Sequence, residues 1–167
     1  MNQIKGDKLI IAEDLGDITE EVIQLVEYSG FPGMRVLQFG FLSDSDTPHL
    51  PHNYPNNCIA YTGTHDNETM VGWFGSISKE EMQLARDYLC DQHTPKKYLY
   101  KSFIAMAMRS VSKYCIIPMQ DWLGLDNKSR TNFPSTIGTN WRWRLTGEQL
   151  SKELQQEILA VTTRYGR

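Results

Sequence analysis

Residues that could carry out acid–base chemistry follow two of the short apolar runs in this sequence. Glu13 comes directly after Leu9 to Ala12, and His65 with Asp66 comes after Cys58 to Thr62. Making or breaking a glycosidic bond needs such carboxylates, because one protonates a leaving oxygen while others manage positive charge at the sugar. The pattern alone is weak, since acidic residues that end a strand often cap the next helix or bind a backbone amide. Both interpretations stay open at this level.

The loop around His65 and Asp66 contains Gly63, which lets the backbone approach a ligand closely. Both side chains could therefore hydrogen-bond sugar hydroxyls. The alternative is a loop histidine whose imidazole is satisfied by backbone groups, and that interpretation stays open. A metal site built from His49, His52 and His65 is a further possibility. We expect none, because a His-x-x-His pair in a Pro/Asn-rich loop lacks the helical phase that would turn both imidazoles toward one ion.

Aromatic residues are frequent in the polar loops, and their rings could stack on the apolar faces of sugars. They are Phe39, Tyr54, Tyr61, Trp73, Trp122, Trp141 and Trp143. The run from Trp141 to Arg144 alternates Trp with Arg. We interpret that run as a strand-like structural clamp held by cation–π contacts rather than as a sugar site.

The elements that must position these residues alternate along the chain. Short apolar runs predict strands at Leu9 to Ala12, Arg35 to Phe41, Cys58 to Thr62 and Cys115 to Met119. Two capping boxes, Asp17 with Glu20 and Ser78 with Glu81, each predict the start of a helix. A third helix is predicted from Thr94-Pro95 to about Tyr114. A last helix is predicted from about Thr146, with a buried stripe at Leu150, Leu154, Ile158 and Val161. This alternation predicts a parallel sheet.

The positions of the polar residues favour one kind of parallel sheet. Glu13, Asp66 and Asp121 all lie just past the carboxyl ends of predicted strands, where (β/α)8 barrels place their chemistry. No GxGxxG or Gly-Lys phosphate loop supports the open, doubly wound alternative. A complete barrel takes about 250 residues and eight strands. We therefore expect an α/β fold that is about half of a TIM-type barrel, with about four parallel strands.

Composition limits the possible partners. The 167 residues are 40% hydrophobic and 22% charged, as in ordinary globular domains, and we expect a single domain over residues 1–167. The net charge of −3 and the absence of a Lys/Arg block argue against nucleic acid and anionic membranes. No membrane span is present, and the polar start Met1 to Lys8 lacks the apolar core of a signal peptide. We expect a cytoplasmic protein.

The cysteines suggest neither disulfides nor zinc. Cys58, Cys90 and Cys115 are widely spaced and odd in number. We interpret all three as packing residues, because free cysteine is among the most buried residue types.

Several long motifs resemble the 4-alpha-glucanotransferase family, also called amylomaltase or disproportionating enzyme, in that family's own order. They are Ala12-Glu13-Asp14-Leu15-Gly16, Phe31 to Phe39, Leu50 to Tyr54, Tyr61 to Asn67, Arg130 to Asn132 and Asn140 to Arg144. The resemblance covers about residues 9 to 145.

The resemblance implies the C-terminal half of a TIM-type barrel and a retaining transferase. Such an enzyme moves a segment of an α-1,4-glucan to a new 4-position of glucose or another α-1,4-glucan, so maltooligosaccharides and α-1,4-glucans are the expected partners. Glu13 would be the general acid/base, and Asp66 the third carboxylate that grips the reacting sugar. His65 would share that grip, and Phe39 would contact the acceptor. No cofactor or metal is expected, because carboxylates suffice for glycosyl transfer.

The sequence departs from the family in one important respect. The family takes its nucleophilic aspartate from a strand before Glu13, and this chain begins too late to include that strand. Asp121 does not correspond to the nucleophile. We therefore expect little or no turnover from this polypeptide alone. A second departure is Phe133-Pro134-Ser135-Thr136, where the family usually has Pro-Gly, so the conformation of that loop is not implied by the resemblance.

Two other functions stay open. The chain could be a non-catalytic glucan-binding or complementing half-barrel module, or an unrelated open α/β domain. A half barrel would also expose sheet edges, through which self-association is possible.

Overall fold

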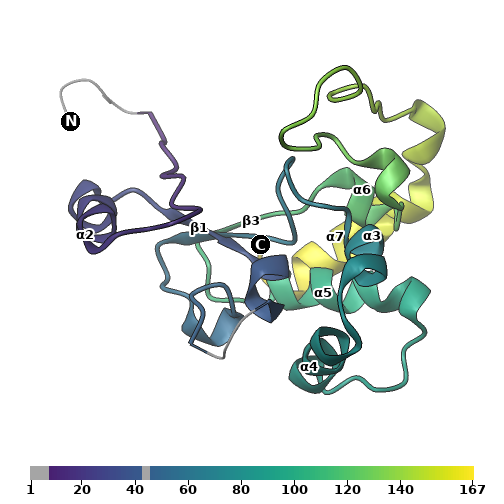
Figure 1. Ribbon diagram of the computed structural model, residues 1–167. Coiled ribbons are helices and arrows are strands. Elements are labelled where there is room, and N and C mark those ends of the chain that lie inside the picture. The colour runs from purple at the N-terminus through teal and green to yellow at the C-terminus, as the bar shows by residue number, and fades with distance from the viewer. Residues whose placement is uncertain (1–7, 43–45) are drawn as a thin grey trace.

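A three-stranded parallel sheet lies at the centre of the computed structural model, which describes residues 8–42 and 46–167 (Figure 1). Its strands are β1 (Gly33–Val36), β2 (Cys58–Tyr61) and β3 (Tyr114–Ile116), in that spatial order. Val36 pairs with Tyr61, and Tyr61 with Ile116, at the last position of each strand. The carboxyl ends of all three strands therefore meet at one edge.

The predicted strand from Leu9 to Ala12 is wrong. This segment is irregular, and Leu9 is 82% exposed. Among the described residues, its one backbone hydrogen bond outside regular elements runs from the Ala12 amide to the Pro32 carbonyl, at 2.9 Å. A strand needs a ladder of such bonds to a neighbour, and an apolar run alone does not provide one. The described part of the chain thus has three strands rather than the four predicted.

Two other strands are shorter than predicted. The run from Arg35 to Phe41 leaves the sheet after Val36 and continues as the 3-10 helix η1 (Leu37–Phe41). The run from Cys115 to Met119 ends at Ile116, and Met119–Trp122 forms α6. Short apolar runs signal burial, and burial does not distinguish a strand from a helical turn.

The remaining helical elements are five α-helices and four short 3-10 turns in the part of the chain that the structure describes. They are α2 (Glu20–Ser29), α3 (Met70–Ser76), α4 (Lys79–Leu89), α5 (Leu99–Met108), α7 (Lys152–Arg164) and the 3-10 turns η2 (Pro51–Asn53), η3 (Lys96–Tyr98), η4 (Asn127–Ser129) and η5 (Gly147–Gln149).

The capping box predicted at Ser78 and Glu81 is confirmed at the start of α4. The Glu81 amide donates to the Ser78 hydroxyl at 3.1 Å, and the Glu81 carboxylate accepts from the Ser78 amide at 2.7 Å. The box predicted at Asp17 is wrong, because α2 follows Thr19 and has no side-chain cap. Both outcomes depend on contacts within one turn of helix.

Two predicted helices have different bounds. The helix predicted to reach Tyr114 ends at Met108. Near this end, the Ser110 hydroxyl donates to the Ala107 carbonyl at 2.7 Å, and this side-chain bond competes with the backbone bond that would continue the helix. The last helix was predicted from Thr146, but that signal makes only η5, and α7 begins after Ser151.

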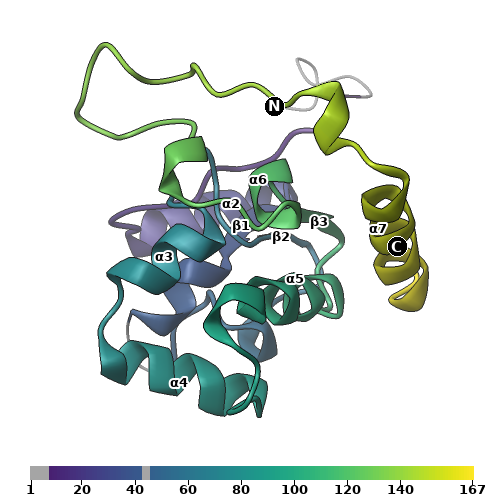
Figure 2. The ribbon, with the colours of Figure 1, turned by 90° about the vertical axis from the view of Figure 1, so that its right-hand side faces the viewer.

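The central strand, β2, is buried on both faces of the sheet. On β2, Cys58 and Ala60 join the main core, and Ile59 and Tyr61 point to the opposite face, as the two-residue period of a strand requires. The main core includes Phe41, Phe74 and Phe103 from η1, α3 and α5. Figure 2 shows α3, α4 and α5 gathered on one side of the strands. The opposite face packs Val36, Ile59 and Tyr61 against Leu15, Met34 and Phe39.

Two helices lie at the periphery. α2 stands apart from the other helices in Figure 1 and buries none of its residues. α7 packs Leu154, Ile158 and Val161 against Ile104, Met108 and Trp122, which confirms three residues of the predicted stripe. Leu150 precedes the helix and is 43% exposed.

The cysteines only partly match their interpretation as packing residues. Cys58 is buried and Cys115 half-buried, and burial raises the pKa of both thiols to about 11. Cys90 is exposed at the left-handed C-cap of α4, so the interpretation is wrong for this residue.

In residues 8–42 and 46–167, no helix combines the length and apolar character that crossing a bilayer requires.

Candidate active-site cleft

A cleft of about 560 Å³ opens at the carboxyl edge of the sheet. Glu13, Phe39, His65 and Asp66, which are the four site residues proposed from the sequence, all line it. The lining also includes apolar side chains, among them Leu15, Met34, Tyr61, Ile116 and Pro134. The cleft thus combines carboxylates with an apolar surface.

The segment that carries Glu13 is fastened to β1 through its neighbour, Asp14. The Asp14 carboxylate accepts from the Met34 amide at 2.6 Å and from Arg35 Nη1 at 2.8 Å. The side chains of this ion pair are only 11% and 16% exposed. Glu13 itself is exposed. Asp14 is therefore the anchor, and it leaves Glu13 free to face a ligand.

His65 and Asp66 lie in a tight turn after β2. The Thr64 amide and hydroxyl both donate to Asn67 Oδ1, at 2.9 and 2.8 Å. Gln38, a buried residue of η1, donates from its side-chain amide to the Glu68 carbonyl at 2.8 Å. The turn is thereby held at both ends, with its central side chains outward.

The loop between α6 and α7 also holds this turn in place. Asn132 Nδ2 donates to Asp66 Oδ1 at 2.5 Å, and Arg130 Nη2 donates to the Asp66 carbonyl at 2.6 Å. The Trp141 ring lies 5.1 Å from the His65 ring. Figure 1 shows this long loop arching beside the loop that follows β2. His65 and Asp66 remain 53% and 49% exposed, and thus accessible to a ligand.

Phe39 is positioned by His49. The two rings meet edge to face with centroids 5.4 Å apart, and His49 Nδ1 accepts from the Val36 amide at 3.1 Å. Burial, with the nearby charge of Arg35, lowers the pKa of His49 to about 4, so the imidazole is neutral near pH 7. It can therefore serve as an acceptor at the end of β1.

Asp121 has a structural environment. It is 1% exposed, and its carboxylate accepts from the Thr62 hydroxyl at 2.5 Å and from the Met70 amide at 2.7 Å. Burial raises its pKa to about 6. This carboxylate joins the end of β2 to the start of α3 and does not line the cleft.

Two interpretations of loop residues are corrected or refined. The run from Trp141 to Arg144 forms no strand, and no cation–π contact joins its residues to one another in the part of the chain that the structure describes. Arg144 instead donates to the Trp141 and Trp143 carbonyls, at 2.7 and 2.8 Å. His52 contacts Tyr88, and within the described ranges no cluster of three His, Cys, Asp or Glu residues suits a metal ion.

Sequence reasoning assigned no role to Arg130, Asn132, His49 or Gln38, although all four support the site. Arg130 and Asn132 lie in one of the family-like motifs, which was the available signal. Gln38 also lies in such a motif, Phe31 to Phe39, whereas His49 lies in none and its partner, the Val36 amide, is 13 residues away.

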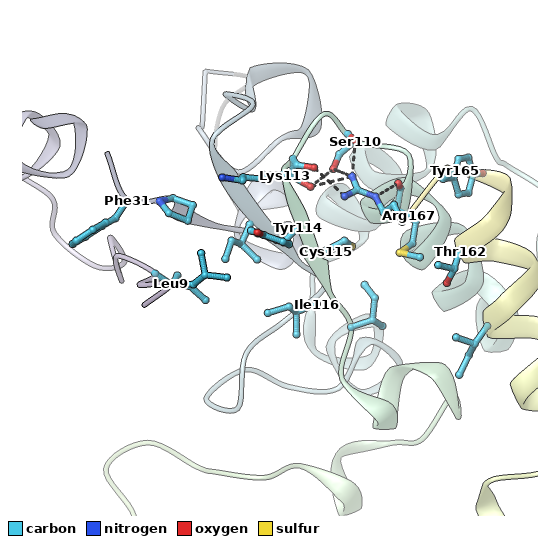
Figure 3. A pocket seen from close by; sticks show the side chains of 18 of the residues that line it. Leu9, Phe31, Ser110, Lys113, Tyr114, Cys115, Ile116, Thr162, Tyr165 and Arg167 are labelled. Atoms are coloured by element: carbon cyan, nitrogen blue, oxygen red, sulfur yellow. Dashed lines mark hydrogen bonds between the residues drawn. The ribbon is translucent and has the colours of Figure 1, made fainter. Parts of the chain in front are cut away.

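A larger cavity of about 1170 Å³ lies beside the free edge of β3 (Figure 3). It is lined by Leu9, Phe31, Tyr114, Ile116, Thr162 and Tyr165 among others, and its lining contains no aspartate or glutamate from residues 8–42 and 46–167. The described lining of this cavity therefore offers no carboxylate for acid–base chemistry. The smaller cleft is therefore the candidate active site.

Known proteins similar to this chain share one description. The sequence model of the 4-alpha-glucanotransferase family matches residues 1–151. The 4-alpha-glucanotransferase of Clostridium butyricum is 46% identical over 163 residues, which cover 97% of this chain and 33% of that protein. The chloroplastic/amyloplastic 4-alpha-glucanotransferase of Solanum tuberosum is 44% identical, over 99% of this chain and 29% of that protein.

Solved structures agree. The amylomaltase of Streptococcus agalactiae in complex with acarbose matches with a TM-score of 0.91 and 38% identity, over 99% of this chain and 33% of that one. The amylomaltase of Corynebacterium glutamicum shares the fold at a TM-score of 0.66 and 18% identity, over 95% of this chain and 29% of that one. The parallel sheet and its helices are thus part of an α/β barrel, and this chain spans about a third of the length of these relatives. The chain belongs to the 4-alpha-glucanotransferase family.

Proposed function

We propose that this chain supplies the acid/base residue and sugar-binding residues of a 4-alpha-glucanotransferase active site. The reaction transfers a segment of an α-1,4-glucan to a new 4-position of glucose or another α-1,4-glucan, with retention. The observation that carries this proposal is the cleft of about 560 Å³, which Glu13, Phe39, His65 and Asp66 line together. Family membership supplies the reaction class.

Glu13 is the proposed general acid/base. Glu13 is exposed, and the neighbouring Asp14 anchors this segment to β1. In the first step Glu13 donates a proton to the departing glycosidic oxygen. In the second step it accepts the proton of the incoming 4-hydroxyl, which restores the starting state.

Asp66, His65 and Phe39 are the proposed substrate contacts. The half-exposed carboxylate of Asp66 and imidazole of His65 can hydrogen-bond sugar hydroxyls, and the negative charge of Asp66 favours a cationic transition state. The ring of Phe39 offers an apolar face to the acceptor sugar. The solved relative in complex with acarbose is consistent with an oligosaccharide ligand.

A retaining transfer also needs a nucleophilic carboxylate about 5–5.5 Å from the acid/base group. Asp121 is unsuited, because it is buried and held by Thr62 and Met70. We propose that the nucleophile belongs to a segment outside this chain, and that residues 1–167 are one part of the catalytic barrel domain. The isolated chain then has little or no turnover.

The free edge of β3 supports a further part of this proposal. Tyr114 and Ile116 on this edge are 41% and 44% exposed, and the apolar cavity lies against them. We propose that the rest of the barrel covers this edge and that, without it, copies of the chain associate with one another. The remaining expectations are a cytoplasmic protein that binds maltooligosaccharides and neither nucleic acid nor membranes.

The test begins with maltotriose and the purified chain, alone and mixed with the N-terminal two-thirds of the Clostridium butyricum relative. We expect glucose and a ladder of longer maltooligosaccharides only from the mixture. The change Glu13→Gln should abolish the ladder, and Glu21→Gln on the exposed helix α2 should leave it intact.

Three outcomes would contradict parts of the proposal. A ladder from the chain alone would mean that one of its own carboxylates is the nucleophile. An active Glu13→Gln mixture would exclude Glu13 as the acid/base. Binding of maltotriose without any ladder in the mixture would favour the non-catalytic glucan-binding module instead.

A further inference from the structure

The carboxylate of Asp66 has one oxygen bound by protein and one oxygen available. Oδ1 accepts from Asn132 Nδ2 at 2.5 Å and lies 3.3 Å from His65 Nε2. Within residues 8–42 and 46–167, no hydrogen bond reaches Oδ2. The Asp66 side chain is 49% exposed, so without the Asn132 contact little would fix its rotamer.

Hydrogen bonds of the Asn132 backbone hold this residue in place, and with it the side-chain amide that reaches Asp66. The Asn132 amide N–H donates to the His65 carbonyl at 3.1 Å, and its carbonyl accepts from Arg130 Nε at 2.8 Å. Arg130 also donates to the Asp66 carbonyl at 2.6 Å. Residue 132 is therefore docked on the turn that it orients.

This docking is itself anchored from the core. Gln120, which is 8% exposed on α6, donates to the Ser129 carbonyl at 3.2 Å and to the Thr131 hydroxyl at 3.0 Å. The chain of contacts runs from α6 through residues 129–132 to Asp66. A rigid support of this kind can define the direction of a half-exposed carboxylate.

We propose that Asn132 is a positioning residue for Asp66: it occupies Oδ1 and thereby presents Oδ2 to a hydroxyl of the reacting α-glucan. This inference rests on the proposed function of the cleft. Asn132 acts through Asp66 and contacts no reacting atom.

The physical consequence is a specific kinetic pattern. Hydrogen bonds that strengthen in the transition state affect kcat, because substrate binding is shared among many other contacts. A hydrogen bond to a charged group carries a loss of about 10- to 100-fold when it is removed, and exposure of Asp66 places the expected loss at the lower end. KM should change by less than about threefold.

Three variants separate positioning from loop stability, assayed in the mixture that forms the maltooligosaccharide ladder. Asn132→Ala removes the donor and should lower kcat by about 10-fold without a change in thermal unfolding. Asn132→Asp keeps the shape but sets two carboxyl groups face to face, so it should lower kcat further, and part of the loss should be recovered as the pH falls and the pair binds a proton.

Asn140→Ala is the matched control. Asn140 lies in the same loop and binds the Phe133 amide at 2.9 Å and the Thr136 carbonyl at 3.0 Å, away from Asp66. It should leave kcat unchanged. Equal losses in Asn132→Ala and Asn140→Ala would overturn the inference in favour of general loop order, and so would an unchanged kcat in Asn132→Ala.

A second readout does not require turnover. In the isolated chain, the side-chain NH₂ resonances of Asn132 should shift on Asp66→Ala, and those of Asn140 should not. If the mixture forms no ladder, the proposed function fails, but the NMR result still decides whether Asn132 binds Asp66. Unshifted Asn132 resonances would overturn the inference whatever the activity.

Discussion

The carboxylate of Asp14 occupies the space where Gly33 would carry a side chain. A Cβ atom at Gly33 would overlap Asp14 Oδ2, and its distance to Asp14 Cγ would be only 2.9 Å. The missing side chain therefore lets Asp14 reach the Met34 amide and Arg35. The same contact sets where the neighbouring Glu13 stands in the cleft.

Gly33→Ala should displace Asp14 and destabilise the chain by about 1–3 kcal/mol, because a partly buried ion pair and a backbone hydrogen bond are disturbed together. Thermal or urea unfolding measures this change. In the ladder-forming mixture, the activity should also fall, since Glu13 moves with Asp14.

Gly75→Ala provides the comparison. Gly75 lies in α3, and a Cβ atom there meets nothing within 4 Å. Alanine should stabilise the helix by about 0.5–1 kcal/mol. Stability losses of equal size in the two variants would contradict the role given to the contact between Gly33 and Asp14.

Asp121 should make the stability depend on pH with an unusual sign. Its folded pKa of about 6 lies above the ordinary value of 3.8, so between about pH 4 and 6 the native state binds more protons than the unfolded state. The contribution of Asp121 to stability is therefore fully present below about pH 4 and falls as the pH rises through 6.

Asp121→Asn tests this sign, because the amide can still bind Thr62 and Met70 but cannot ionise. From pH 4 to pH 7, the unfolding free energy of the original chain should fall relative to that of the variant by on the order of 2–3 kcal/mol. A difference that stays constant over this range would show that Asp121 titrates normally.

His49 should titrate in the opposite sense. Its pKa of about 4 lies below the ordinary 6.5, so the unfolded state binds more protons between these values and stability is lost as the pH falls. Protonation would also end the bond from the Val36 amide to Nδ1. In an NMR titration, the His49 ring signals should move with a midpoint near pH 4, accompanied by the Phe39 ring signals. A midpoint near 6.5 would contradict the buried environment.

Arg167 should anchor the end of α7. Its guanidinium donates to the carbonyls of Met108, Ser110 and Ser112 at 2.6, 2.7 and 2.9 Å, and so ties α7 to the connection between α5 and β3. Arg167→Ala should cost about 1–3 kcal/mol and speed hydrogen exchange in α7. Arg164→Ala, at an exposed position of the same helix, should have a much smaller effect. Similar exchange in the two variants would contradict an anchoring role.

Local patterns in the sequence were sufficient for part of this structure. The capping box at Ser78 and Glu81 depends on contacts within one turn of helix, so a local pattern was enough to predict it. The expectation that Glu13 and Asp66 reach one cleft was also available from the sequence, since polar residues after parallel strands share one edge of the sheet.

Only the tertiary structure decided the rest. The bond between Asn132 and Asp66 joins residues 66 positions apart, and the bond between Asp14 and Arg35 spans 21. The apolar run from Leu9 to Ala12 reads as a strand, yet strand formation requires a neighbouring backbone that no local pattern can supply. By itself the sequence determined which residues are polar, apolar or helix-capping. Which of them meet depended on packing across the fold, because a hydrogen bond or an ion pair forms only where folding brings both partners within about 3 Å.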